Sequence, residues 1–332
     1  MSSATACAQP NIALVKYWGK RDEGLILPAT GSLSMTLDAF TTTTTVRLGV
    51  EADSFTLNGS PAAEAAMSRT TSFLDLVREL AADDGPAAVT SVNEAPTGAG
   101  LASSASGFAA LALAASKAYG LDLDQSELSR LARRGSGSAC RSIVPGFAVW
   151  HAGRDDASSY AEPIPAPDLR LVIVTIDSHE KAVSSREAMR LTRDTSPFYN
   201  AWISSTEAVL DEMVSACRTG DIARIGELTE LHALRMHAVI ASCRPPVRYL
   251  APASVSVFDA AAALRASGVQ AWATADAGPN VCLLTTPGEA GEVASAVSGL
   301  GRVRVVSPGP GARLVSPGLG ARSVPTPGSE EM

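Results

Sequence analysis

The strongest local signal in this sequence is a turn of small residues, PTGAGLASSASG (96–107), between a β-branched stretch and an apolar one. The preceding AVTSVNEA is typical of a strand, and the following FAALALAASKAYG is typical of a helix that ends at Gly120. Such a turn presents unpaired backbone N–H groups at the positive end of the helix dipole, with the hydroxyls of Ser103, Ser104 and Ser106 beside them. It therefore predicts a phosphate-binding loop, although it matches neither GxxxxGK[ST] nor GxGxxG. An ordinary capped helix with a flexible lead-in is the alternative.

A second Gly/Ser segment, RRGSGSACRS (133–142), follows the first. Ser136, Gly137 and Ser138 are again small and able to form hydrogen bonds, and Arg141 comes within one turn of them. A guanidinium is suited to bind a carboxylate or a phosphate through two parallel hydrogen bonds. The segment predicts an anion clamp, and the alternative is a linker with an incidental salt bridge.

Lysine is rare in this chain, with only four among the 27 basic residues. Two of them, Lys16 and Lys20, flank Tyr17 and Trp18 in NIALVKYWGKRD, and Lys181 begins KAVSSREAM. Three of the four lysines thus lie in segments that could bind anions. Together with two Gly/Ser loops in a chain of net charge −7, they predict more than one phosphorylated ligand. A solvated lysine pair at a strand end is the alternative for NIALVKYWGKRD.

Asp276 lies at the end of an apolar strand, before the turn AGPN. Its carboxylate could simply cap that turn. It could instead accept a proton from, or orient, a hydroxyl that attacks a phosphate. The residues themselves leave both roles open.

Composition excludes several classes of protein. The negative net charge and the absence of any Lys/Arg run argue against nucleic-acid binding. No segment approaches 18 apolar residues, which argues against a membrane span, and the N-terminus does not resemble a signal peptide. Five cysteines without a CxxC pair favour reduced thiols in the cytoplasm, and four histidines without ligand spacing predict no tightly bound metal.

The remaining patterns predict an α+β protein in two layered halves. Strands are expected at 11–18, 32–38, 41–50, 88–95, 169–177 and as a pair within 269–285, and helices at 68–82, 108–120, 124–134, within 197–237 and at 254–268. The side chains expected on the buried face of the first helix are Phe73, Leu76, Val77 and Leu80. Near the C-terminus, VSPGPGAR (306–313) recurs as VSPGLGAR (315–322), and this Pro/Gly-rich second copy is expected to have no packed structure.

Taken together, the motifs resemble one family. PTGAGLASSASGFAAL resembles the PxxxGLxSSxA signature of the GHMP kinases, and Ala102, where the kinases usually carry Gly, resembles the diphosphomevalonate decarboxylase branch. NIALVKYWGKRD, RRGSGSACRS, VSSREAM and DAGPN resemble the same branch, in order and spacing, from Ala4 to Leu314. The resemblance implies an N-terminal half like domain 2 of ribosomal protein S5, a C-terminal α+β half and an active-site cleft between them. It implies a GHMP ATP-binding domain at 1–180, a C-terminal decarboxylase domain at 181–314 and a disordered tail at 315–332.

The resemblance also implies a reaction. ATP and mevalonate 5-diphosphate, a small-molecule substrate, would yield isopentenyl diphosphate, ADP, phosphate and CO2, with Mg²⁺ carried by ATP, and the family's habit suggests a homodimer. One alternative is a paralogue acting on another phosphorylated 3-hydroxy acid, such as mevalonate 5-phosphate. Others are a GHMP small-molecule kinase that does not decarboxylate, and a degenerate member that binds nucleotide as a sensor.

By resemblance, the catalytic residues are Asp276, Arg141, Lys16 and Asn11. The implied substrate-binding residues are Tyr17, Trp18, Gly19, Lys20, Arg69, Ser136, Gly137, Ser138, Ala139, Cys140, Arg141, Ser185 and Arg186. The implied ATP-binding residues are Pro96, Gly98, Gly100, Leu101, Ala102, Ser103, Ser104, Ser106 and Lys181. The positions that depart from the family's usual residues are Thr30, Gly31, Val144, Pro145, His232 (usually Asn), Ala275 and Cys282 (commonly Lys). These departures are the reason why a different substrate stays an alternative.

Overall fold

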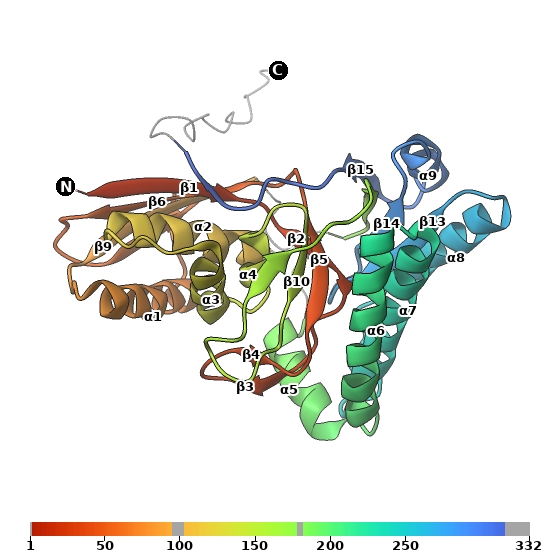
Figure 1. Cartoon of the computed structure of the whole chain (residues 1–332), viewed down its shortest axis with the longest axis horizontal. Coiled ribbons are helices and arrows are strands. Elements are labelled where there is room, and N and C mark those ends of the chain that lie inside the picture. Colours follow the sequence, from red (N-terminus) through yellow and green to blue (C-terminus); the bar gives the residue numbers. More distant parts are fainter. Residues whose placement is uncertain (1, 95–102, 178–181, 316–332) are drawn as a thin grey trace, which may run out of the picture.

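A computed structural model describes residues 2–94, 103–177 and 182–315 of the chain. The α+β class predicted from the sequence is confirmed: the structure combines β-sheets with helices and has two halves (Figure 1). The sheet of the first half has the order β16-β1-β6-β9-β7-β8. Its strands are β1 (Ser3–Ala8), β6 (Thr42–Leu48), β7 (Ser54–Leu57), β8 (Ser60–Pro61), β9 (Ala87–Asn93) and β16 (Arg313–Leu314).

Helices pack on this sheet and bury an alanine-rich core. They are α1 (Glu64–Ala81), α2 (Ser103–Ala118), α3 (Gln125–Gly135) and the short α4 (Ala139–Ser142). In α1 the prediction holds for Phe73 and Val77, which are buried, but is wrong for Leu80, which is 57% exposed. Leu80 lies in the last turn, where the chain leaves the helix through the left-handed Ala82 (φ 49°).

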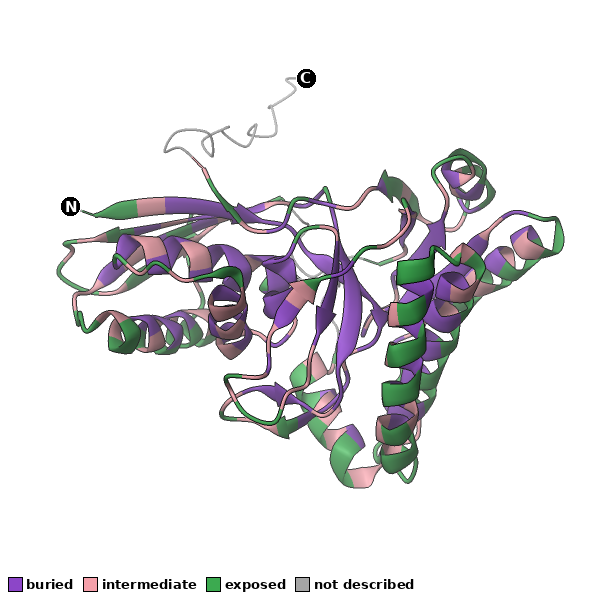
Figure 2. Cartoon of the chain, viewed as in Figure 1, coloured by how far each residue is buried: buried purple, intermediate pink, exposed green. Residues whose placement is uncertain are grey.

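A second sheet, of order β11-β10-β5-β2, lies in the middle of the molecule. Its strands are β2 (Asn11–Val15), β5 (Ser32–Thr36), β10 (Phe147–Trp150) and β11 (Ala161–Pro163), and a small hairpin of β3 (Lys20–Asp22) and β4 (Leu27–Pro28) follows β2. Figure 2 shows these central strands as buried, whereas the outer face of the neighbouring helix α6 (Tyr199–Thr219) is exposed.

A third sheet, of order β13-β14-β12-β15, forms the C-terminal half. Its strands, all antiparallel, are β12 (Arg170–Thr175), β13 (Ala271–Ala275), β14 (Val281–Thr285) and β15 (Arg302–Val306). The apolar β12 lies inside the sheet, between β14 and β15, as is typical of an almost fully apolar strand. The helices of this half are α5 (Ser185–Thr195), α6 (Tyr199–Thr219), α7 (Ile222–Ala241), α8 (Pro252–Ala266) and α9 (Ala290–Ala296). The helical stretch 197–237 thus divides into α6 and α7, because Gly220 takes a left-handed conformation and Asp221 caps α7.

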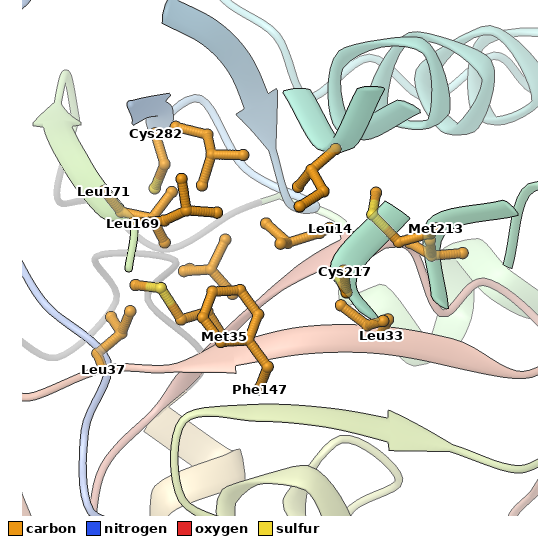
Figure 3. Packing of buried hydrophobic residues seen from close by; sticks show 14 of the residues in the cluster. Leu14, Leu33, Met35, Leu37, Phe147, Leu169, Leu171, Met213, Cys217 and Cys282 are labelled. Carbon is orange, nitrogen blue, oxygen red and sulfur yellow. The ribbon is translucent and has the colours of Figure 1, made fainter. Parts of the chain in front are cut away.

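One apolar cluster spans the two halves (Figure 3). Leu33 and Phe147 of the central sheet meet Met213 of α6 and Leu171 and Cys282 of the third sheet. Burying a single leucine side chain contributes about 1.5–3 kcal/mol, so this shared core stabilises the arrangement of the halves. The residues at their boundary are consequently held in place.

The chain crosses between the halves more than once. Strand β12 pairs only with strands of the third sheet, so we propose a boundary between β11 and β12, earlier than the expected 180/181. After β15 the chain returns to the first half, where Pro308 bridges to Leu37 and β16 pairs with β1. The second tail copy lies, from residue 316 on, outside the described residues.

Candidate active site

The side chains of Lys16 and Asp276 meet where the two halves join. Lys16 directly follows β2, Asp276 directly follows β13, and Lys16 Nζ lies 2.6 Å from Asp276 Oδ1. The Lys16 side chain is 1% exposed and that of Asp276 is 30% exposed. Asp276 Oδ2 has no hydrogen-bond partner within the described part of the chain. The pair therefore presents one open carboxylate oxygen, and Asp276 does not simply cap its own turn.

Arg141 is held on three sides. Its Nε donates to Asn11 Oδ1 (3.1 Å) and to Ser34 Oγ (3.0 Å), and its Nη1 donates to Ser32 Oγ (2.5 Å). Burial lowers the pKa of its guanidinium, and the nearby charge of Asp276 acts in the opposite direction. Among the described residues Nη2 has no hydrogen-bond partner. Arg141 is thus a rigid, buried cation with one donor nitrogen to spare.

Asn11 joins the first strand of this site to the 133–142 segment. Its Nδ2 donates to the Ser138 carbonyl (3.0 Å) and to Ser142 Oγ (2.8 Å), while its Oδ1 accepts from Arg141. All the hydrogen-bonding atoms of the Asn11 side chain are therefore used inside the protein. In this structure Asn11 holds Arg141 rather than facing a ligand.

Tyr17 presents a buried hydroxyl without a partner. Its Oη makes no hydrogen bond among the described residues, and burial raises its pKa. The ring packs 4.8 Å from that of Trp150. A Cβ at Gly137 would lie 2.8 Å from Tyr17 Oη, which explains the glycine at that position. An orphaned buried donor costs free energy, so an acceptor atom placed next to the Tyr17 hydroxyl would be stabilised.

Lys20 lies in a cluster of cations around one carboxylate. Its Nζ lies 3.2 Å from Glu23 Oε2, and the same carboxylate contacts Arg190 (3.3 Å) and Arg193 (3.7 Å) of α5. Burial lowers the pKa of Lys20, Glu23 counteracts this, and Arg186 lowers it further. Glu23 was missed by sequence reasoning, because nothing in its local sequence distinguishes it from a solvated surface carboxylate.

Arg186 and Arg69 belong to the same electrostatic neighbourhood as Tyr17 and Lys20. The charge of Arg186, in the first turn of α5 after Ser185, affects the pKa values of Tyr17, Lys20 and Arg69. Burial lowers the pKa of Arg69, and Arg186 lowers it further. The Arg69 guanidinium lies over the Phe108 ring, 5.0 Å from its centroid. Four of the expected substrate-binding residues thus lie within one electrostatic neighbourhood.

Trp18 and Gly19 shape the loop between Tyr17 and Lys20. The Trp18 carbonyl accepts a hydrogen bond from Trp202 Nε1 (2.9 Å). Gly19 has a φ of +114°, and a Cβ there would lie 2.1 Å from the Tyr199 hydroxyl. Trp18 and Gly19 therefore contribute by packing, which fixes the backbone between Tyr17 and Lys20.

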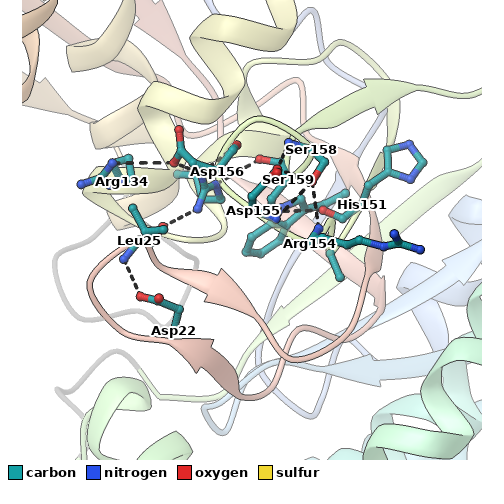
Figure 4. A network of polar contacts seen from close by, with 12 residues as sticks. Asp22, Leu25, Arg134, His151, Arg154, Asp155, Asp156, Ser158 and Ser159 are labelled. Carbon is teal, nitrogen blue, oxygen red and sulfur yellow. Dashed lines mark hydrogen bonds and ion pairs between the residues drawn. The ribbon is translucent and has the colours of Figure 1, made fainter.

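A polar network connects α3 and the segment 151–159 to the hairpin of β3 and β4 (Figure 4). The fully buried Arg133 of α3 donates to the Leu25 carbonyl, to Asp156 (2.5 Å) and to the Ser159 carbonyl (3.1 Å). Leu25 N–H in turn donates to Asp22 Oδ1 (2.7 Å). Sequence reasoning singled out only the neighbouring small residues and missed Arg133.

In the 133–142 segment, residues 139–142 form the helical turn α4. Ala139 and Cys140 are buried, burial raises the pKa of the Cys140 thiol to about 12, and its S–H donates to the Gly137 carbonyl, so neither side chain offers a charged group at neutral pH. Ser136 Oγ lies 3.3 Å from Ser104 Oγ, which joins this segment to the start of α2.

The expected ATP loop is described only in part. Ser103 is the first residue of α2, and Ser104 is exposed near its start. Ser106 is fully buried, with its hydroxyl 2.8 Å from that of Thr42, so it stabilises the helix against β6. Six expected ATP-binding residues lie outside the described residues: Pro96, Gly98, Gly100, Leu101, Ala102 and Lys181.

Within 2–94, 103–177 and 182–315, no three His, Cys, Asp or Glu side chains lie together so as to hold a metal ion. Among the helices described, none is both long and apolar enough to cross a membrane.

Two family models match the chain. One, described as the diphosphomevalonate decarboxylase-like N-terminal domain, matches residues 8–161, and the other, the mevalonate 5-diphosphate decarboxylase C-terminal domain, matches residues 171–303. The diphosphomevalonate decarboxylase of Homo sapiens is 35% identical over 324 residues, which are 90% of this chain and 80% of that protein. That of Ganoderma lucidum is 36% identical over 314 residues, which are 85% of this chain and 78% of that protein.

The chain is also similar in fold and sequence to solved structures of mevalonate diphosphate decarboxylases. The mevalonate diphosphate decarboxylase from Staphylococcus aureus is 39% identical, with a TM-score of 0.91 over 95% of this chain and 98% of the other. That from Enterococcus faecalis is 43% identical, with a TM-score of 0.89 over 95% and 99%. A third structure, described as MDDEF in complex with MVAPP, AMPPCP and magnesium, is 44% identical, with a TM-score of 0.90 over 95% and 99%.

Proposed function

The chain belongs to the diphosphomevalonate decarboxylase family, and we propose from this premise how its residues carry out the ATP-dependent decarboxylation of mevalonate 5-diphosphate. The products are isopentenyl diphosphate, ADP, phosphate and CO2, and the reaction belongs to the mevalonate pathway of isoprenoid synthesis. The observation that carries the assignment of roles is the ion pair of Lys16 and Asp276 at the junction of the halves, with the buried Arg141 guanidinium within the electrostatic influence of Asp276.

The reacting end of the substrate binds between Asp276 and Arg141. Asp276 Oδ2 accepts the proton of the 3-hydroxyl and orients that hydroxyl for attack, while Lys16 holds Oδ1. The spare Nη2 of Arg141 binds the substrate carboxylate, and Asn11 keeps the guanidinium in place. A preorganised cation next to a developing charge can contribute several kcal/mol to catalysis.

The diphosphate of the substrate binds around Tyr17, Lys20, Arg69 and Arg186, with Ser185 at the start of α5. The unpaired Tyr17 hydroxyl fits an acceptor oxygen, and the three cations fit a highly negative group. Glu23 neutralises part of this cluster in the absence of substrate. These features support a diphosphate better than a neutral ligand.

ATP binds at the start of α2. The exposed Ser104 hydroxyl lies beside that of Ser136, and hard oxygen donors of this kind suit Mg²⁺ that arrives on the nucleotide phosphates. The similar solved structure described as a complex with MVAPP, AMPPCP and magnesium supports the use of ATP and Mg²⁺. Bound there, ATP supplies the phosphoryl group that turns the tertiary hydroxyl into a good leaving group.

The residue types match the chemistry of the carbon skeleton. Loss of phosphate develops positive charge at C3, and the electrons of the breaking C1–C2 bond neutralise it as CO2 leaves. Arg141 holds the carboxylate in line with the leaving group, which is an alignment effect that can matter by orders of magnitude. A GHMP kinase that only phosphorylates needs no such clamp, so the decarboxylase is favoured over that alternative.

One assay tests the function directly. The protein is incubated with ATP and mevalonate 5-diphosphate, and ADP and CO2 are measured together. Equal amounts of both products are expected. ADP without CO2 would favour the kinase alternative, and turnover of mevalonate 5-phosphate instead would favour the paralogue.

Location and assembly are further proposals. We place the enzyme in the cytoplasm, since all five cysteines are buried and free, as in reducing compartments. The homodimer implied by the family resemblance is tested by light scattering on the purified protein.

A further inference from the structure

Helix α7 packs against both strands that lead into the Lys16–Asp276 pair, β2 and β13. It carries two buried histidines, His232 and His237, which the roles proposed above do not use. Each contacts the backbone at one member of the pair. His232 contacts the N–H of Lys16, and His237 contacts the carbonyl of Ala275, directly before Asp276.

Hydrogen bonds determine the tautomer of His232. The Lys16 N–H can only donate, so the Nδ1 that lies 2.8 Å from it carries a lone pair. Thr206 Oγ1 donates to the Trp202 carbonyl (2.7 Å) and is left free to accept from His232 Nε2–H (3.2 Å). The imidazole also packs 4.5 Å from the Trp202 ring. Burial lowers the pKa of His232 to about 3, so the ring keeps this neutral acceptor form at neutral pH.

His237 has the complementary arrangement. The Ala275 carbonyl can only accept, so the Nε2 that lies 3.3 Å from it carries the proton. Burial lowers the pKa of His237 to about 4, and at neutral pH this contact is between two neutral groups. His237 thereby holds the last residue of β13, from which Asp276 projects.

The spacing of the two histidines suits this arrangement. Five residues on a helix differ by about 140° in direction and about 7.5 Å in height, so the rings cannot share one ligand. They can hold two different strands that lie on either side of the helix. We propose that His232 and His237 are positioning residues, which set the separation and orientation of Lys16 and Asp276 through the backbones of β2 and β13.

This inference rests on the proposed catalytic roles of Lys16 and Asp276. Sequence reasoning noted His232 only as a departure from the family's usual Asn. The structure explains why both residue types suit the position, because an Asn amide oxygen lies near the place of His Nδ1 and can also accept from Lys16 N–H. The essential property at position 232 is therefore an acceptor at that point.

An Asn/Gln exchange at each position tests the proposal. Asn places its amide near Nδ1 of the replaced histidine, whereas Gln places its amide near Nε2. His232→Asn should keep the contact to Lys16, and His232→Gln should lose it. At the second position the order reverses, since His237→Gln keeps a donor for Ala275 and His237→Asn does not.

The expected result is a crossed pattern in kcat. We expect kcat to fall by about 10²-fold in His232→Gln and His237→Asn, the scale for a misplacement of about 1 Å, and by much less in the other two. KM for mevalonate 5-diphosphate should stay unchanged in all four, because Lys20 and Arg186 bind the diphosphate elsewhere. Equal losses in the Asn and Gln variants at both positions would overturn the positioning role.

Two further measurements separate the possible failures. Asp276→Asn is assayed alongside: if it keeps full turnover, the proposed catalytic role of Asp276 is wrong, whereas if it is inactive and the crossed pattern is absent, only this inference is wrong. Should a variant fail to fold, ¹⁵N NMR of the wild-type imidazoles decides. A neutral ring with the proton on Nε2 is expected for His232, and a proton on Nδ1 would overturn the proposal.

Discussion

Lys16 Nζ lies 2.6 Å from Asp276 Oδ1, although 260 positions separate the two residues in the chain. The Lys16 side chain is buried, whereas Asp276 Oδ2 has no hydrogen-bond partner among the described residues. A buried cation that loses its partner costs several kcal/mol, so the pair couples the packing of the two halves to the geometry of the site. This coupling makes single substitutions informative.

Asp276→Asn keeps the shape of the side chain and removes its charge. We expect kcat to fall by about 10³-fold or more, because a positioned base and its electrostatic contribution are both lost. KM should change little, since a carboxylate adds little to the binding of a highly anionic substrate. Steady-state kinetics measure both values, with the exposed Asp211→Asn as control. Turnover near that of the wild type would refute the assigned acid–base residue.

Arg141→Lys keeps the charge and loses the planar two-point grip on a carboxylate. Decarboxylation should slow more than phosphorylation, so a 3-phosphorylated intermediate should accumulate. Rapid quench followed by ³¹P NMR detects that species, and Arg218→Lys on the exposed face of α6 is the matched control. A variant that loses ADP and CO2 formation in parallel would contradict the separate role of Arg141.

Lys20→Ala should mainly raise KM for the diphosphate substrate. The expected loss is about 2–4 kcal/mol of binding free energy, the scale of charged hydrogen bonds. The control is Lys117→Ala. It removes a lysine of α2 that is paired with Asp122, and it should leave KM unchanged. Kinetics with mevalonate 5-diphosphate and 5-phosphate test this in the wild type and both variants. Equal use of the two substrates by the wild type would argue against the diphosphate assignment.

Truncation after Leu314 should leave both Tm and turnover unchanged, because the second tail copy repeats a segment and carries no motif. Truncation after Val306 should lower both. It removes Gly309, whose N–H donates to the Thr36 carbonyl (2.7 Å), while the Thr36 hydroxyl contacts the Arg141 carbonyl (3.3 Å). Calorimetry and the coupled assay compare the two truncated proteins. Identical behaviour of both would show that the returning segment is dispensable.

Acid should destabilise the fold through the two buried histidines. Burial lowers their pKa values to about 3 for His232 and about 4 for His237, from an ordinary 6.5. The unfolded chain binds these protons more readily, so the free energy of unfolding should be highest above pH 6.5 and fall as the pH decreases toward 4. Thermal melts across this range measure the slope, which His237→Gln should flatten. An unchanged slope would mean that His237 does not contribute.

The segments that make up the candidate site could be singled out from the sequence, because each is a pattern of neighbouring residues. Gly/Ser turns before helices, a nearby Arg141 and the apolar strand 169–177 are local patterns, and backbone conformation follows local chemistry. The resemblance in these motifs was confirmed by the family models and the solved structures. The sequence alone therefore determined the class of fold and the family.

Only the tertiary structure decided which side chains meet. Lys16 with Asp276, Glu23 with Arg190 and His232 with the Lys16 backbone are contacts between elements far apart in the chain. Burial decided their chemistry as well, since a histidine on a helix has an ordinary pKa until neighbouring elements exclude water from it. Local sequence carries no record of such long-range packing, because distances and solvent exclusion arise only when the two halves form a common core.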